Sequence, residues 1–234
     1  SSAASDVYKR QACDILFESN EVNFRATRDL DMVLIVEALT PEFGEKFWEF
    51  IVDGKYRNKA TNGSNPQFYR FDKPEDDEFP KMIELFCRSD FKLKNAKGIT
   101  PIHIDDEVSS LSAILLNDDY YKALLNGKEV RNGLSVLRPE YIILFKAKAY
   151  LDLQKRKDSG EKLDSSDIKK HKKDILRIAS ELMLEKVEGL PIAVGNDIHS
   201  FIDLLEQEPF DQNSLKRYGL KNEDIMELLK KVFG

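Results

Sequence analysis

A short apolar run headed by two acidic residues constrains this chain more than any other feature. Asp29 and Asp31 stand two residues apart at the start of the run MVLIV at residues 32–36. Such a run is typical of a buried strand, in which alternate side chains share one face. The two carboxylates should therefore lie side by side, roughly 6–7 Å apart, where they repel each other and lose hydration.

Two interpretations of this acidic pair stay open. A divalent cation shared by both carboxylates would remove the repulsion, and hard oxygen ligands suit magnesium. Alternatively, the pair is the solvated start of a strand with two surface acids, because Asp-x-Asp is a short and common pattern.

A third acid, Glu84, favours the metal interpretation. It lies in the middle of a second apolar run, PKMIELFC at residues 80–87, where a buried strand normally carries an aliphatic residue. If the two strands are neighbours, Glu84 joins Asp29 and Asp31 in a cluster of three carboxylates. That cluster is the ligand set of a two-metal phosphoryl-transfer site. The alternative is a glutamate on an exposed strand face, paired with Arg88.

The residues around the two aspartates follow a pattern that one enzyme superfamily shares. Arg25, Thr27, Asp29 and Asp31 alternate along the chain ahead of the apolar strand. This pattern resembles the nucleotidyltransferase superfamily of DNA polymerase beta. Within that superfamily, the chain is most similar to the AbiEii/AbiGii-type toxin nucleotidyltransferases.

Two later segments resemble the same family in the expected order, so that the resemblance spans roughly residues 12–185. Residues 138–150 (RPEYIILFKAKAY) are similar to its helix with a Lys-x-x-Ala-hydrophobic element. Residues 170–175 (KHKKDI) are similar to its element of a basic residue, an acid, a gap of two, Asp and an aliphatic residue. His171 stands where the family usually has the acid.

The resemblance implies the fold and the domains. We expect an α/β (α+β) fold with a nucleotidyltransferase-type mixed sheet and flanking helices at residues 12–133. A helical domain should follow at residues 134–234. Residues 1–11 look like a non-native prefix, and we expect an N-terminally truncated member of the family.

The resemblance also implies a reaction with Mg²⁺ as its cofactor. A nucleotide would pass from a nucleoside triphosphate to an acceptor hydroxyl, and Asp29, Asp31 and Glu84 would be the catalytic, metal-binding carboxylates. The residues that would bind the nucleotide are Thr27, Lys146 and Asp174. Lys146 should face the carboxylates, because a triphosphate needs positive charge opposite the metal.

The implied role is that of a toxin or defence protein. The acceptor would be RNA, a protein side chain or a small molecule, and the partner a cognate antitoxin. One departure favours a different function: the family usually has a Gly-Gly-(Ser/Thr/Ala) turn whose backbone amides hold the phosphates, and residues 8–11 read YKRQ instead. The alternative is therefore a non-catalytic nucleotide- or protein-binding member of the same fold.

Composition excludes several other classes of protein. The 234 residues are 41% hydrophobic, enough to bury a core in one or two domains. No stretch of about 18 apolar residues exists and the N-terminus has no apolar signal region, so we expect no membrane association and a cytoplasmic location. Two cysteines in apolar contexts and three scattered histidines do not suggest a zinc site.

The charge is uneven along the chain. The net charge is −6, whereas residues 146–177 contain eleven Lys and Arg against six Asp and Glu, a local charge of +5. The excess fits a solvated helix surface, and it also fits a face that binds a nucleotide or RNA phosphate.

Three side chains of this basic half are candidates for specific roles. Lys146 either binds the triphosphate or extends to solvent, and Lys148 should pair with Asp152 on the same helix face. His171 either forms a buried hydrogen bond with Asp174 or leaves that acid free to orient Lys146. The elements that we expect are strands at 29–37, 67–71, 80–87 and 111–116, helices at 40–52, 139–156, 165–184, 196–206 and 221–233, and a turn at 214–221.

Overall fold

The chain forms two compact units, each of which is described here by itself. The computed structural model describes residues 29–34, 41–58, 68–76, 79–87, 114, 117–131 and 134–234. The first unit contains the described elements up to residue 87, and the second contains those from residue 114 onward.

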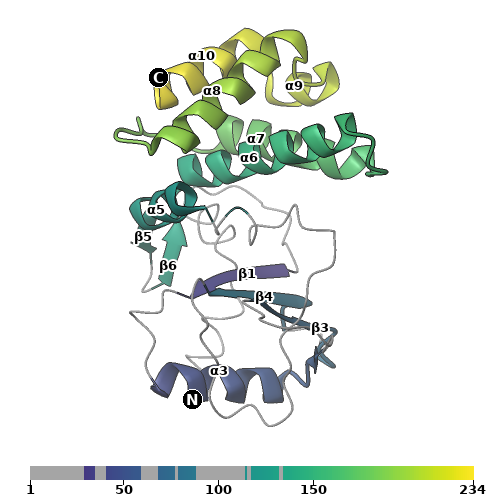
Figure 1. Cartoon of the computed structure of the whole chain (residues 1–234), viewed down its shortest axis with the longest axis vertical. Coiled ribbons are helices and arrows are strands. Elements are labelled where there is room, and N and C mark those ends of the chain that lie inside the picture. Colours follow the sequence, from purple (N-terminus) through teal and green to yellow (C-terminus); the bar gives the residue numbers. More distant parts are fainter. Residues whose placement is uncertain are drawn as a thin grey trace. The chain divides into compact units, whose positions relative to one another are not determined.

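The first unit contains a mixed sheet of four strands in the order β1-β4-β3-β2 (Figure 1). β1 is parallel to β4, whereas β3 is antiparallel to both β4 and β2. The bounds are β1 (Asp29–Leu34), α3 (Pro41–Asp53), β2 (Arg57–Asn58), β3 (Phe68–Asp72) and β4 (Met82–Cys87). The strands expected at 67–71 and 80–87 and the helix expected at 40–52 are confirmed, although the second strand begins only at Met82. The described part of the first expected strand ends at residue 34.

Helix α3 packs on the sheet through aromatic side chains. Phe47, Phe50 and Ile51 recur at helical spacing and are buried. The ring of Phe47 lies 5.7 Å from the ring of Phe71 on β3, in an edge-to-face arrangement. The amphipathic pattern of α3 therefore buries one face of the helix against β3.

The second unit is mainly helical. Its elements are α5 (Asp118–Asn126), β5 (Lys128–Arg131), β6 (Leu134–Leu137), α6 (Pro139–Asp158), α7 (Ser165–Glu181), α8 (Ile192–Gln207), α9 (Gln212–Tyr218) and α10 (Asn222–Phe233). α6 packs against α5, α7 and α8, and α10 packs against α7 and α8 (Figure 1). Because α6 is covered from several sides, it buries residues such as Ile143, Leu144 and Ala147 around its circumference.

Most helices expected in this half are confirmed, and two expectations are wrong. Instead of a turn at 214–221, the chain forms α9, because Asp211 caps the helix by accepting a hydrogen bond from the Ser214 N–H at 2.9 Å. Gly219, at φ 65°, ends α9 in the left-handed conformation that glycine adopts most easily. Ile114, a described residue of the strand expected at 111–116, is helical.

A β-hairpin joins α5 to α6. β5 and β6 are antiparallel, and the Arg138 N–H donates to the Gly127 carbonyl at 2.9 Å to close the pair. α5 contacts α6 and α8, so α5 and β5 are grouped with the helical elements. The boundary between the two units therefore lies before residue 133, where we expected the first domain to end.

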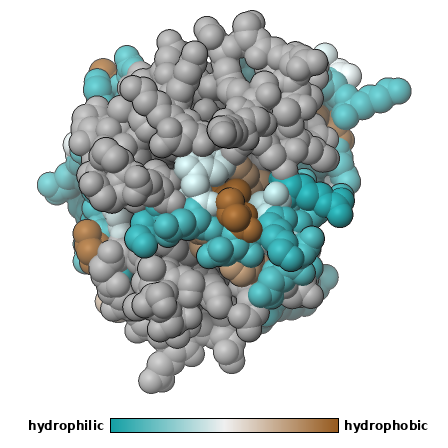
Figure 2. Space-filling model, turned by 90° about the horizontal axis from the view of Figure 1, so that it is seen from below, coloured by the Kyte–Doolittle hydropathy of each residue, from teal (hydrophilic) through white to brown (hydrophobic). Residues whose placement is uncertain are grey.

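One face of the described surface is mostly polar. Seen from below, hydrophilic residues dominate the part that is not grey, with hydrophobic residues in small spots (Figure 2). Within the described ranges, no helix is both long and apolar enough to cross a membrane.

Candidate functional site

The sheet brings two of the predicted acidic positions together. β1 and β4 are parallel neighbours, and Asp31 is the register partner of Glu84. Asp29 lies two residues earlier on β1, opposite Met82. Since neighbouring strands are about 4.8 Å apart, the three acidic positions fall within one small area of the sheet. The expected adjacency of the two strands is confirmed.

The side chains of these acids lie outside the described part of the structure. A shared magnesium ion therefore stays a prediction, which the backbone register fits. Among the side chains that the structure does describe, no group of three His, Cys, Asp or Glu could hold a metal ion. Thr27, predicted to bind the nucleotide, and the expected prefix at 1–11 also lie outside the described residues.

Sequence reasoning missed a basic position in the same row of the sheet. Arg70 on β3 is the register partner of Glu84, so Asp31, Glu84 and Arg70 occupy one register row across three strands. The signal was available, because Arg70 interrupts the aromatic run FYRF at 68–71 just as Glu84 interrupts its own run.

The helical unit brings together the two predicted nucleotide-binding residues that it contains. Lys146 on α6 and Asp174 on α7 form an ion pair, with Nζ 2.6 Å from Oδ2. The two side chains keep 27% and 35% of their surface exposed, so solvent reaches the pair. Asp174 thus holds the ammonium group of Lys146 at one place on the surface of this unit.

His171 lies beside this ion pair without joining it. Its buried Nδ1 has no hydrogen-bond partner among the described residues, and Asp174 pairs with Lys146 instead. Of the two alternatives left open for His171, the hydrogen bond with Asp174 is therefore not formed. Burial is the main cause that lowers the pKa of His171 to about 4, and Lys146 and Lys170 lower it further, against the opposite effect of Asp174 and Asp167. The imidazole is neutral at pH 7.

The buried imidazole predicts a loss of stability in acid. The pKa of His171 is about 4 in the folded chain and about 6.5 in the unfolded chain, so the unfolded state binds more protons between these values. The free energy of unfolding should fall as the pH drops through this window, by about 2 kcal/mol between pH 7 and pH 5. His171→Gln removes the titrating group. Urea unfolding measures the free energy of unfolding at pH 7 and pH 5 in both proteins. The fall between the two pH values should be about 2 kcal/mol smaller in the variant than in the unsubstituted chain. Equal falls in the two proteins would contradict the prediction.

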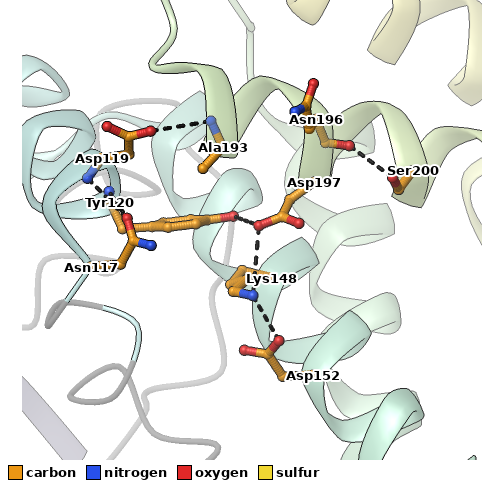
Figure 3. Close-up of polar contacts among 9 residues, drawn as sticks. All are labelled: Asn117, Asp119, Tyr120, Lys148, Asp152, Ala193, Asn196, Asp197 and Ser200. Carbon is orange, nitrogen blue, oxygen red and sulfur yellow. Dashed lines mark hydrogen bonds and ion pairs between the residues drawn. The ribbon is translucent and has the colours of Figure 1, made fainter.

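A second polar cluster joins α5, α6 and α8. The buried Tyr120 hydroxyl donates to Asp197 Oδ2 at 2.9 Å, and Lys148 Nζ lies 3.6 Å from the same carboxylate oxygen. Lys148 also bonds Asp152 at 2.7 Å, which confirms the pair expected on this helix (Figure 3). Asp119 on α5 accepts a hydrogen bond from the Ala193 N–H, in the first turn of α8, at 3.2 Å.

The charges in this cluster compensate one another. Burial lowers the pKa of Lys148, but hydrogen bonds and charge from Asp152 and Asp197 outweigh burial and leave that pKa above its ordinary value. Burial, followed by the charge of Asp197, raises the pKa of Tyr120. Tyr120 is therefore a neutral donor and Lys148 a cation with two carboxylate neighbours, so the cluster is a structural joint between the three helices.

Comparison with protein-family models, with curated proteins and with solved structures finds no match for this chain. The sequence motifs, the register of the sheet and the contacts of the helical unit are therefore the grounds for a functional proposal.

Proposed function

We propose that this chain is a magnesium-dependent nucleotidyltransferase that moves a nucleotide from a nucleoside triphosphate to an acceptor hydroxyl. The register of Asp31 with Glu84 on parallel neighbouring strands, with Asp29 two residues away, is the observation that carries the proposal. It brings the predicted carboxylate positions to one place, and carboxylate oxygens are the ligands that magnesium prefers.

The proposed residues have different roles in the reaction. Asp29, Asp31 and Glu84 would hold magnesium, which would neutralise phosphate charge and make the acceptor hydroxyl more acidic. Glu84 would accept the proton of this hydroxyl as its oxygen attacks the α-phosphate. The bond from the α-phosphorus to the bridging oxygen breaks, and pyrophosphate leaves. The acceptor would be RNA, a protein or a small molecule, and the resemblance adds a cognate antitoxin as a partner.

Lys146 has a defined part in this proposal. Its ammonium group would bind the triphosphate, and Asp174, 2.6 Å away, would orient it. The placement of Lys146 opposite the carboxylates concerns two separate units and stays a prediction.

The direct test is label transfer by the purified chain. The chain is incubated with each of the four α-³²P-labelled nucleoside triphosphates, magnesium and either RNA or protein acceptors. We expect label on one acceptor class and none with EDTA. Absence of label with every acceptor, combined with intact nucleotide binding, would overturn the enzyme proposal in favour of a non-catalytic nucleotide-binding protein.

Lys146→Ala should weaken the binding of nucleoside triphosphate about tenfold, because a charged contact with phosphate is lost. The fold should survive, since an ion pair that solvent reaches contributes only about 1 kcal/mol to stability. Calorimetry with magnesium present measures the affinity. Lys155→Ala removes an exposed lysine from the same helix and is the matched control. An unchanged affinity in Lys146→Ala would exclude this lysine from the nucleotide site.

A further inference from the structure

A pocket lies wholly within the helical unit. It has a volume of about 510 Å³ and is lined by α6, α7, the segment 208–211 and the start of α9. That volume is in the range of small-molecule sites, about 300–1,000 Å³. Neither Lys146 nor Asp174 lines it, so it is separate from the nucleotide contacts proposed above.

Lysines surround this pocket, and α7 supplies three of them. Lys169, Lys172 and Lys173 recur at helical spacing on one face of α7, and Lys157 adds a fourth from the last turns of α6. Lys157 and Lys169 are exposed and have no ion pair among the described residues. Two cations at the rim are therefore available to a ligand.

Lys172 lines the pocket and is half-buried. Its Nζ donates to the Glu208 carbonyl and lies 5.8 Å from the centre of the Tyr150 ring and 5.6 Å from that of Phe210. Burial lowers the pKa of Lys172, against the opposing charge of Glu208. An anion that enters the pocket would meet an ammonium group that is already partly removed from water.

The two acids of the pocket already have partners. Glu208 Oε2 accepts the Tyr150 hydroxyl at 3.0 Å. Asp211 Oδ2 accepts both the N–H and the hydroxyl of Ser214, each at 2.9 Å, as the cap of α9. Four lysines therefore face two carboxylates that are engaged in holding the pocket together, and the net charge of the lining favours an anionic ligand.

The inner wall is apolar. Ile168, Leu176 and Phe210 line the pocket and are buried in the unit. A ligand would fit this pocket if its charged group contacts the exposed lysines and a flatter, less polar part packs against the apolar wall. A nucleotide has this division, with phosphate at one end and base and sugar at the other.

We propose that this pocket binds a nucleotide unit through its phosphate, without a metal ion. The proposal goes beyond the transfer reaction and does not require it. The phosphate could belong to a free nucleotide or to a single-stranded RNA, and the experiment below separates these two sources.

The test measures binding in EDTA, where the proposed magnesium site cannot contribute. Fluorescence anisotropy follows a labelled ten-nucleotide uridine RNA at several salt concentrations, with AMP as competitor. The variant is Lys157→Gln/Lys169→Gln. The matched control is Lys155→Gln/Lys170→Gln, which removes two exposed lysines from the same helices outside the pocket lining.

We expect the variant to bind RNA about tenfold more weakly than the control. Because each phosphate contact on a single strand contributes about 0.7 to the slope of log affinity against log salt, the slope should fall by about 1.4. Competition by AMP would identify the free nucleotide as the occupant, and binding that resists AMP would identify the polynucleotide.

Equal losses in variant and control would overturn the proposal, because they would show a diffuse charge effect rather than a pocket. Absence of binding by both RNA and AMP to the unsubstituted chain would overturn it as well. A thermal melt of each protein verifies that the substitutions leave the fold intact. The transfer assay with magnesium can succeed or fail independently of these results.

Discussion

Asp31→Asn should abolish magnesium-dependent nucleotide transfer, with a loss on the order of 10³-fold, or about 4 kcal/mol of transition-state stabilisation. The substitution keeps the size of the side chain and removes the negative charge at the position that is in register with Glu84. Label transfer at saturating magnesium and nucleoside triphosphate measures the effect, and circular dichroism verifies the fold.

Asp53→Asn is the matched control for this prediction. Asp53 is the exposed last residue of α3 in the same unit, and its substitution removes the same charge. We expect transfer by this variant to equal that of the unsubstituted chain. A similar loss in both variants, or full activity in Asp31→Asn, would remove Asp31 from the catalytic set.

Asp197→Ala should lower the free energy of unfolding by about 3 kcal/mol. The substitution leaves the hydroxyl of Tyr120, which is only 1% exposed, without its partner, and an unsatisfied buried donor costs about 1–3 kcal/mol. Lys148 loses one of its two carboxylates but keeps Asp152, so the charge effect adds only about 1 kcal/mol. Urea unfolding measures the loss.

A double-mutant cycle separates the two contributions. Tyr120→Phe removes the hydroxyl and keeps the ion pair, so its combination with Asp197→Ala should show a coupling of about 1–2 kcal/mol. A loss below about 1 kcal/mol in Asp197→Ala alone would contradict the assignment of this cluster as a joint.

Sequence periodicity predicted the elements whose pattern is local. The run around Glu84 and the apolar stripe Ile168, Ile175 and Ile178 of the helix expected at 165–184 each identify an element without reference to the rest of the chain. The hairpin β5–β6 was missed, although Asn132-Gly133 between its strands is a strong turn signal. The helix α9 was missed because it is short, and its Asp211 cap is a weaker signal than a long apolar stripe.

Contacts between distant residues were less predictable. Asp174 was expected within reach of Lys146, and the structure confirms that contact. Tyr120 and Asp197 are 77 residues apart, and no spacing rule connects them. The wall of the lysine-lined pocket likewise combines α6, α7 and the segment 208–211, so that only the packing of the helices brings its residues together.

The hydrogen bond between Asp119 and the first turn of α8 connects two segments that lie far apart in the chain. Asp119 lies 74 residues before Ala193, whose N–H it accepts. Unwinding of the first turn of α8 at Ala193 therefore also breaks this contact with α5. Tyr120, the next residue, bonds α8 a second time through Asp197. Local fraying at these two places is therefore coupled, and α5 belongs to the same cooperative folding unit as α8.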